Sequence, residues 1–208
     1  LPAQLPPRTA SAQPRTTLAV PDDAAVARAR EAARGSEDLQ ALKQQLEAFD
    51  GCSLKFTAKN LVFSDGNPEA RIMMIGEAPG RDEDIEGRPF VGKAGQLLDR
   101  MLGAIGMDRT QVYIANVIYW RPPGNRPPNE LECRLIVPFA QRAIELLQPK
   151  LIFAMGALPG QWLAGGPESI QRQRGTWLSA GGVPLIATFH PEALLKSPAL
   201  KRLAWHDL

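Results

Sequence analysis

Three side chains suited to acid–base and hydrogen-bonding chemistry each follow or end a short apolar run in this sequence: Glu77, Asn116 and His190. A carboxylate can orient water or stabilise a cation, an amide can both donate and accept, and an imidazole can donate to a developing anion. Each residue alone has a structural alternative, as a helix-terminal carboxylate, a turn residue and a packed histidine respectively. Their equivalent positions along the chain favour one shared pocket.

The elements that must position these residues alternate along the chain. Short apolar runs at residues 71–75, 112–118, 151–155 and 184–188 are typical of buried strands, and helical spacing covers 94–105, 130–147 and 159–163. This alternation predicts βαβ units and a three-layer α/β/α fold with a four-stranded parallel sheet. Ligands of such sheets bind beyond the carboxyl ends of the strands, where Glu77, Asn116 and His190 fall.

The segments before this alternating region have a simpler character. Residues 1–20 are rich in Pro, Ala, Thr and Arg, so we expect a disordered or loosely docked arm, with a single domain over residues 21–208. Helices are expected at 22–33 and 37–49, and a short strand at 61–63 is expected to precede a turn at 65–68.

Composition limits the classes of protein that this chain can belong to. Its 208 residues carry a formal net charge of +2, which permits nucleic acid as a partner without requiring it. Two cysteines argue against a disulfide scaffold and for a reducing compartment. No apolar run approaches the length of a membrane span, so no membrane partner is expected.

The loop after the first predicted strand is rich in glycine and proline. It reads GEAPG at residues 76–80 and continues as PFVGKAGQLL at residues 89–98. Glycines let backbone N–H groups approach a ligand closely. The sequence matches neither G-x-x-x-x-G-K-[ST] nor G-x-G-x-x-G, so the two common nucleotide-binding fingerprints are excluded.

These motifs together resemble the uracil-DNA glycosylase superfamily, most closely its family 4 type. The resemblance runs from about residue 46 to residue 208 and includes GEAPG, GRPFVGKAG at 87–95, Asn116, RPPGNR at 121–126 and FHPEALL at 189–195. It implies an enzyme that flips uracil out of single- or double-stranded DNA and hydrolyses its bond to the sugar. It also implies a monomer in the cytoplasm of a bacterial-type cell, associated with the nucleoid.

The resemblance assigns roles to individual positions. Glu77 and His190 are the expected catalytic residues, since one can orient water and the other can donate to uracil O2 as charge develops. Uracil is expected to contact Gly76, Ala78, Phe90 and Asn116, with Phe90 stacking on the base and Asn116 reading its edge. The expected DNA contacts, mostly to phosphate, are Lys93, Arg121, Arg126, Leu194 and Lys196. Leu194 could wedge into the base stack or begin a buried helix, and with Leu195 beside it we expect at least one of the two leucines to be buried.

One departure from the family pattern concerns a cofactor. Family 4 enzymes usually hold a 4Fe–4S cluster with four cysteines, and here Cys52 and Cys133 stand at two of those positions while Phe49 and Trp120 stand at the others. Two thiolates cannot supply a Cys₄ set, so we expect no cluster and no other metal, with the aromatic side chains filling the space. A disulfide between the cysteines and a cluster completed by another chain are the alternatives.

Several other functions share the same predicted fold. A protein that binds damaged bases or abasic sites with little turnover needs the same DNA-binding face. A glycosylase with a broader pocket for deaminated or alkylated bases is also compatible with the sequence. A member that attaches covalently to the abasic sugar usually carries an extra basic loop, which is missing between Phe90 and Asn116. A small-molecule α/β enzyme would lack salt-sensitive DNA binding.

Overall fold

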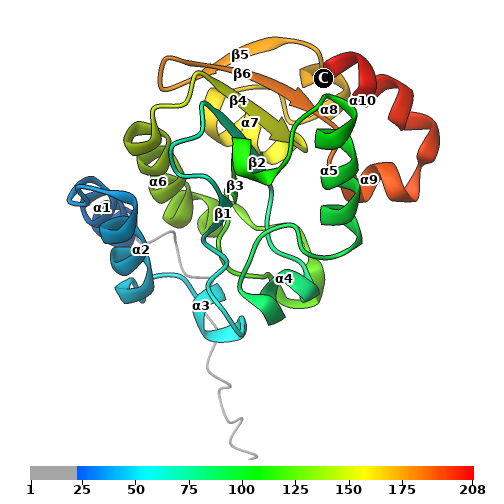
Figure 1. Cartoon of the computed structure of the whole chain (residues 1–208). Helices are drawn as coiled ribbons and strands as arrows, with labels where there is room; N and C mark the ends of the chain where they lie inside the picture. The colour runs from blue at the N-terminus through cyan, green and yellow to red at the C-terminus, as the bar shows by residue number, and fades with distance from the viewer. Residues whose placement is uncertain (1–22) are drawn as a thin grey trace, which may run out of the picture.

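A six-stranded sheet runs through the middle of the molecule (Figure 1). The computed structural model describes residues 23–208, and the arm expected at residues 1–20 lies outside them. The strand order is β1-β3-β2-β4-β6-β5. The four inner strands are parallel: β3 (Val112–Asn116), β2 (Ile72–Gly76), β4 (Leu151–Met155) and β6 (Val183–Thr188). They confirm the predicted parallel sheet.

Two short antiparallel strands at the sheet edges were not predicted. β1 (Ser64–Gly66) pairs with β3, and β5 (Trp177–Ala180) pairs with β6. The strand expected at 61–63 was wrong, because the ladder begins one residue later, where Ser64 lies opposite Ala115. The residues of β1 are polar and few, so no apolar alternation marks them in the sequence.

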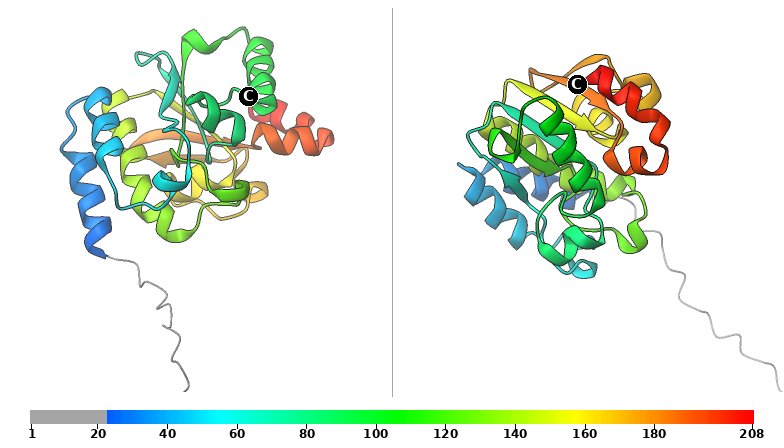
Figure 2. Two further views of the ribbon diagram at one scale, coloured as in Figure 1. Left: turned by 90° about the horizontal axis from the view of Figure 1, so that it is seen from below. Right: turned by 45° about the vertical axis from the view of Figure 1, so that its right-hand side comes forward.

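Helices cover both faces of the sheet, which makes the three layers visible in Figure 2. Met73 and Ile75 of β2 belong to a core shared with α1 (Asp23–Arg34), α2 (Leu39–Ala48) and α6 (Glu130–Leu147). Met74 points the other way and packs in a second core with Leu98 and Leu102 of α5 (Lys93–Ala104). Burial on both faces explains why the strands read as continuous apolar runs.

The remaining helices are short. They are α3 (Leu54–Thr57), α4 (Arg81–Glu86), α7 (Ala157–Ala164), α8 (Ile170–Gln173), α9 (Pro191–Lys196) and α10 (Lys201–Asp207), with 3₁₀ turns η1 (Arg109–Gln111), η2 (Pro123–Asn125) and η3 (Pro198–Leu200). The helices predicted at 94–105 and 159–163 correspond to α5 and α7. Among residues 23–208, no helix combines the length and the apolar character needed to cross a bilayer.

The longest helix, α6, begins where the sequence indicates. The side chain of Asn129 accepts the backbone N–H of Glu132 at 2.8 Å, and the carboxylate of Glu132 accepts the N–H of Asn129 at 2.8 Å. This capping box satisfies two N–H groups that the first turn leaves free. The predicted bounds 130–147 therefore agree with the observed helix.

The register of the parallel strands brings the candidate residues to one edge. Gly76 lies opposite Asn116, and the pairing continues past the strand ends because the N–H of Ile118 donates to the carbonyl of Glu77 at 3.0 Å. Thr188, two residues before His190, lies opposite Met155. Glu77, Asn116 and His190 thus all stand at the carboxyl end of the sheet.

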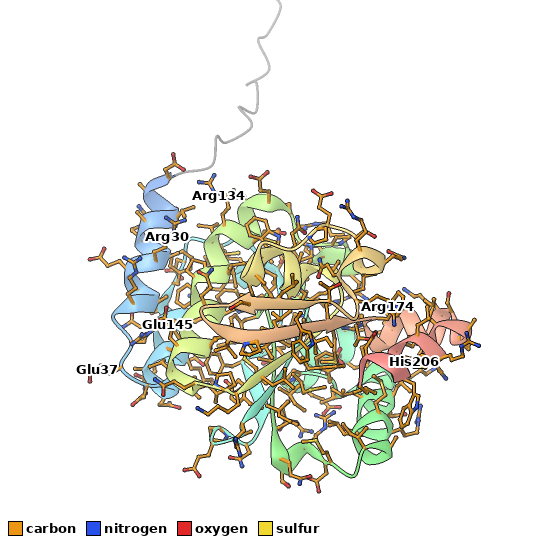
Figure 3. The ribbon with its side chains drawn as sticks, turned by 90° about the horizontal axis from the view of Figure 1, so that it is seen from above. Arg30, Glu37, Arg134, Glu145, Arg174 and His206 are labelled. Atoms are coloured by element: carbon orange, nitrogen blue, oxygen red, sulfur yellow. The ribbon has the colours of Figure 1, made fainter. Side chains whose placement is uncertain are left out.

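A buried ion pair fastens the strand that leads to His190. Arg174 donates to Asp207 through two nitrogens, at 2.6 and 3.1 Å, and its guanidinium lies 5.8 Å from the ring centroid of Phe189. The hydroxyl of Thr188 donates to Asp207 at 2.7 Å. Figure 3 shows Arg174 beside α10, the helix that carries His206. The end of β6 is therefore tied to α10 by polar contacts.

We expect Asp207→Asn to destabilise the fold. The amide has one accepting oxygen in place of two, so it cannot accept all three hydrogen bonds from Arg174 and Thr188. This leaves a partly buried guanidinium with a weaker partner, and the free energy of unfolding should fall by about 1–3 kcal/mol. Urea denaturation measures this difference. The control is Asp50→Asn, because the side chain of Asp50 is 71% exposed in its ion pair with Lys55, and such exposed pairs contribute about 0–1 kcal/mol. Equal effects of the two changes would contradict the role of Asp207.

Candidate active site

A cavity of about 180 Å³ opens at the carboxyl end of the sheet. Its walls include the four side chains that the sequence singled out for the base and its hydrolysis: Glu77, Phe90, Asn116 and His190. They come from the loop after β2, the last residue of β3, the loop after β6 and the loop before α5. Residues separated by more than a hundred positions in the sequence thus line one cavity, as the predicted parallel sheet implies.

Asn116 is the most deeply placed polar residue of the cavity. It is 2% exposed, and its Oδ1 is a buried atom that finds no hydrogen-bond partner among residues 23–208. A Cβ atom added to Gly76 would lie 2.4 Å from this Oδ1 and 2.5 Å from the ring of Phe90, so only glycine fits beneath the two side chains. An unpaired buried acceptor costs about 1–3 kcal/mol, which a ligand that donates a hydrogen bond there recovers.

Glu77 is held by the start of a helix. Its Oε1 accepts the backbone N–H groups of Ala157 at 3.0 Å and Leu158 at 3.3 Å, the first two residues of α7. These are N–H groups that a helix leaves without partners, and they favour a negative charge. Within the described part of the chain, Oε2 accepts no hydrogen bond. One oxygen therefore fixes the carboxylate, and the other is free for a water molecule.

His190 is present as one defined tautomer. It caps α9, and its Nδ1 accepts the backbone N–H of Glu192 at 3.2 Å. The proton of the neutral ring is therefore on Nε2, which can donate. Burial lowers the pKa of His190 below the usual value for histidine, although the negative charges of Glu77, Glu192 and Glu83 oppose this shift. A neutral imidazole with a donor at Nε2 is the form present at neutral pH.

Phe90 forms an aromatic wall of the cavity. Its ring stacks on that of His190, with the centroids 5.5 Å apart and the planes at 28°. Its backbone lies in the left-handed region, at φ 54°, which costs a non-glycine residue about 1–3 kcal/mol. The carbonyl oxygen of Phe90 also packs so closely on α5 that a Cβ on Gly95 would lie 1.7 Å from it. The surrounding structure must therefore hold this conformation.

Two charged residues beside this loop were not predicted from the sequence to belong to the site. Glu83 lies in the first turn of α4 and accepts backbone N–H groups from both sides of the cavity, and Arg109 donates to the loop that carries Phe90. Glu83 stands three residues after Gly80, a spacing that indicates a helix cap and gave a usable signal. Arg109 had none, because its contacts are far away in sequence.

The side chains expected to contact DNA differ in their exposure and in whether they already pair with other protein groups. Lys93 is exposed at the start of α5, and Lys196 is exposed but pairs with Glu192 at 2.7 Å. Arg126 donates two hydrogen bonds to Glu132, at 2.5 and 2.8 Å, and thereby closes the loop before α6. Arg121 donates to Asn125, a residue of the cavity lining, at 2.6 Å. Both arginines are thus already engaged with protein groups.

Leu194 does not lie on the surface where a DNA contact was expected. It is 1% exposed and packs with Leu97, Phe189 and Ala204 in a small core between α5, α9 and α10. The next residue, Leu195, is 36% exposed. This corrects the assignment of Leu194 to DNA and confirms that one of the two leucines is buried.

Comparison with known proteins agrees with this geometry. A model of the uracil DNA glycosylase superfamily matches residues 63–208. This chain belongs to that superfamily. The Type-4 uracil-DNA glycosylase of Thermotoga maritima is 38% identical over 178 residues, which are 83% of this chain and 92% of the relative. The Type-4 enzyme of Sulfurisphaera tokodaii is 37% identical over 180 residues, 82% of each chain. The uracil-DNA glycosylase fold predicted from the motifs is thus confirmed.

The chain's own residues do not fit the iron–sulfur cluster that the family 4 resemblance implies. Phe49, Cys52, Trp120 and Cys133 are all buried in the core on the α6 side of the sheet, and both cysteines are free thiols. Two of the four positions therefore offer only aromatic side chains. Burial raises the pKa of Cys52 to about 11 and that of Cys133 to about 12, so both thiols are protonated at neutral pH. Residues 23–208 contain no cluster of three or more His, Cys, Asp or Glu placed to hold a metal ion.

We expect His190 to titrate below the usual histidine pKa of about 6.5, because burial disfavours its charged form. The unfolded chain then takes up this proton at a higher pH than the folded protein does. Stability from this group is complete above pH ~6.5 and falls as the pH drops towards the folded pKa. The NMR titration of the His190 ring protons in a His206→Gln variant measures the midpoint. A midpoint at or above the usual value would contradict the burial argument.

Proposed function

We propose that this protein is a uracil-DNA glycosylase, which flips uracil out of DNA, hydrolyses the bond between the base and the deoxyribose, and leaves an abasic site. The observation that carries the proposal is the buried, unpartnered Oδ1 of Asn116 in a cavity of about 180 Å³. Relatives that are 37–38% identical to this chain are named Type-4 uracil-DNA glycosylases, which supports the same substrate.

Asn116 selects uracil by the direction of two hydrogen bonds. The Oδ1 atom accepts the N3–H of uracil, and the side-chain NH₂ donates to the adjacent O4. Cytosine presents an acceptor and a donor in the reverse order, so both contacts are lost with that base. Gly76 leaves the space in which the base edge meets this amide, and Phe90 offers an aromatic face for stacking.

His190 and Glu77 stabilise the charges that develop on the base and the sugar during hydrolysis. As the bond from C1′ to N1 breaks, uracil leaves as an anion, and Nε2–H of His190 donates to O2. The free Oε2 of Glu77 orients a water molecule towards C1′ and offsets the positive charge on the sugar. The oxygen of water bonds to C1′, one of its protons is lost, and the departing uracil anion takes up a proton.

The DNA strand lies across the mouth of this cavity in the proposal. Lys93 at the start of α5 and Lys196 at the end of α9 are exposed cations, and in this proposal they contact phosphates without reading sequence. Leu195, exposed on α9, fills the place in the stack that the flipped base vacates. The protein acts as a monomer on uracil in single or double strands, because a single chain supplies all the side chains assigned to the base.

We also propose that the enzyme works without an iron–sulfur cluster. The four positions at which family 4 members carry cysteine ligands hold Phe49, Cys52, Trp120 and Cys133, which pack as part of the hydrophobic core. The ring of Phe49 lies 5.6 Å from that of Phe139 of α6, so aromatic packing joins these loops to the helix. No step of the proposed reaction requires electron transfer.

The first test is release of free uracil from a uracil-containing single strand and from a U·G duplex. We expect release from the parent protein, and loss of about 100-fold or more in kcat/KM for Asn116→Asp, because a carboxylate cannot donate to O4. Asn67→Asp is the control, since Asn67 pairs with the start of β3 at the opposite end of the sheet. Tight binding of uracil or abasic DNA without release would favour a damage-binding protein instead.

Glu77→Gln tests the second role. The amide is nearly the same size and can still accept the N–H groups of α7 through one oxygen, but it carries no negative charge. We expect kcat to fall about 100-fold or more, with little change in the affinity for uracil-containing DNA. Single-turnover kinetics and fluorescence anisotropy measure the two quantities. An unchanged rate would remove Glu77 from the reaction.

Iron analysis tests the proposed absence of the cluster. Protein purified without oxygen from iron-supplemented cells should contain far less than one iron per chain and no broad visible absorption. The variant Cys52→Ala/Cys133→Ala should keep its uracil-releasing activity, because neither thiol would be a ligand. Iron and sulfide present in amounts stoichiometric with the chain, and lost from this variant, would overturn the proposal.

A further inference from the structure

The peptide unit that joins Phe90 to Val91 is clamped at both of its polar ends. Nη2 of Arg109 donates to the carbonyl of Phe90, and Nη1 donates to the carbonyl of Pro89 at 3.3 Å. On the other side, Oε1 of Glu83 accepts the N–H of Val91 at 3.1 Å. The orientation of this peptide fixes the backbone of Phe90 and so the direction in which its ring points.

Glu83 connects two of the loops that line the cavity. Besides Val91, its carboxylate accepts the N–H of Gly92 at 3.1 Å through Oε1 and that of Gly80 at 3.2 Å through Oε2. Gly80 ends the loop that carries Glu77. The loop of the carboxylate and the loop of the aromatic wall are therefore held at a fixed separation by one side chain.

Arg109 is itself braced from two other elements. Its Nη1 donates to Asp65 of β1 at 2.7 Å, and its Nε donates to Asp99 of α5 at 2.7 Å. The guanidinium thus joins β1, α5 and the Phe90 loop in one network. A planar group with donors in fixed directions suits such a site, whereas a lysine ammonium cannot reproduce these contacts.

We propose that Arg109 is a positioning residue for uracil excision, which acts by holding Phe90 in its left-handed conformation. This inference rests on the proposed function. Phe90 stacks on His190 and reaches over Gly76, so a change of its backbone alters the face for the base and the neighbour of the donating imidazole together. Arg109 contributes no side chain to the wall of the cavity. Its effect must therefore pass through Phe90.

The test compares Arg109→Met with a matched control, Arg142→Met. Arg142 also donates to one backbone carbonyl, that of Ser36 at 2.8 and 3.1 Å, and to a carboxylate, Glu145 at 2.7 Å. The side chains of Arg109 and Arg142 are 25% and 26% exposed. Arg142 lies on α6, on the side of the molecule where Figure 3 labels Glu145, away from α5.

We expect Arg109→Met to lower kcat/KM for uracil release about 10- to 100-fold, as a misplaced contact group does, while Arg142→Met changes it less than about twofold. The loss should disappear when both arginine variants are measured in a Phe90→Ala background, because the residue through which Arg109 acts is then absent. The same loss in both backgrounds would overturn the inference. Arg109→Lys, which keeps the charge, should recover only part of the rate.

A second measurement does not depend on activity. The ring of Phe90 shifts the NMR resonances of the stacked His190 ring, and His206→Gln leaves His190 as the single histidine. Arg109→Met should move these resonances towards those of Phe90→Ala, and Arg142→Met should leave them in place. Unmoved His190 resonances in a folded Arg109→Met protein would overturn the inference. Should Arg109→Met not fold, Asp99→Asn, which removes one brace, should give the same shift at smaller amplitude. No uracil release by the parent would instead refute the proposed function.

Discussion

The register between β2 and β3 is the constraint on which the site depends. Because Gly76 lies opposite Asn116 in a parallel pair, the residues that follow both strands emerge side by side at one edge. Parallel pairing of β4 and β6 brings the start of α7 and the residues before α9 to the same edge. A one-residue slip of β3 would send Asn116 to the opposite face of the sheet and empty the cavity of its only deep amide.

The cavity keeps its polar groups at a cost to stability. Asn116 buries an unpartnered oxygen, Phe90 holds a strained backbone, and His190 is neutral in a place surrounded by carboxylates. Hydrogen bonds elsewhere in the site offset these costs in stability. They are the bonds from the start of α7 that hold Glu77 and those that hold the peptide after Phe90 at both ends. A site prepared in this way needs little reorganisation when charge develops.

The sequence alone predicted most of the framework and the central residues of the site. Continuous apolar runs marked the four parallel strands, and their ends marked Glu77, Asn116 and His190, since strand direction alone brings these ends together. The edge strands were not predicted, because β1 is only three residues long and shows no apolar alternation. The contribution of Arg109 was not predicted, because its hydrogen-bond partners come from three separate segments of the chain. Which of two adjacent leucines is buried depended on the orientation of α9, which spacing alone did not settle.

The aromatic pair Phe49 and Trp120 changes what assembly of this fold requires. Side chains that pack as part of the core form their contacts in the same cooperative transition as the rest of the domain. The segments that carry Cys52 and Cys133 are then joined by dispersion and burial, forces that do not respond to oxidants, chelators or the supply of inorganic sulfide. In the cluster-free enzyme that we propose, maturation is a matter of chain folding alone, independent of the cell's metal-delivery machinery.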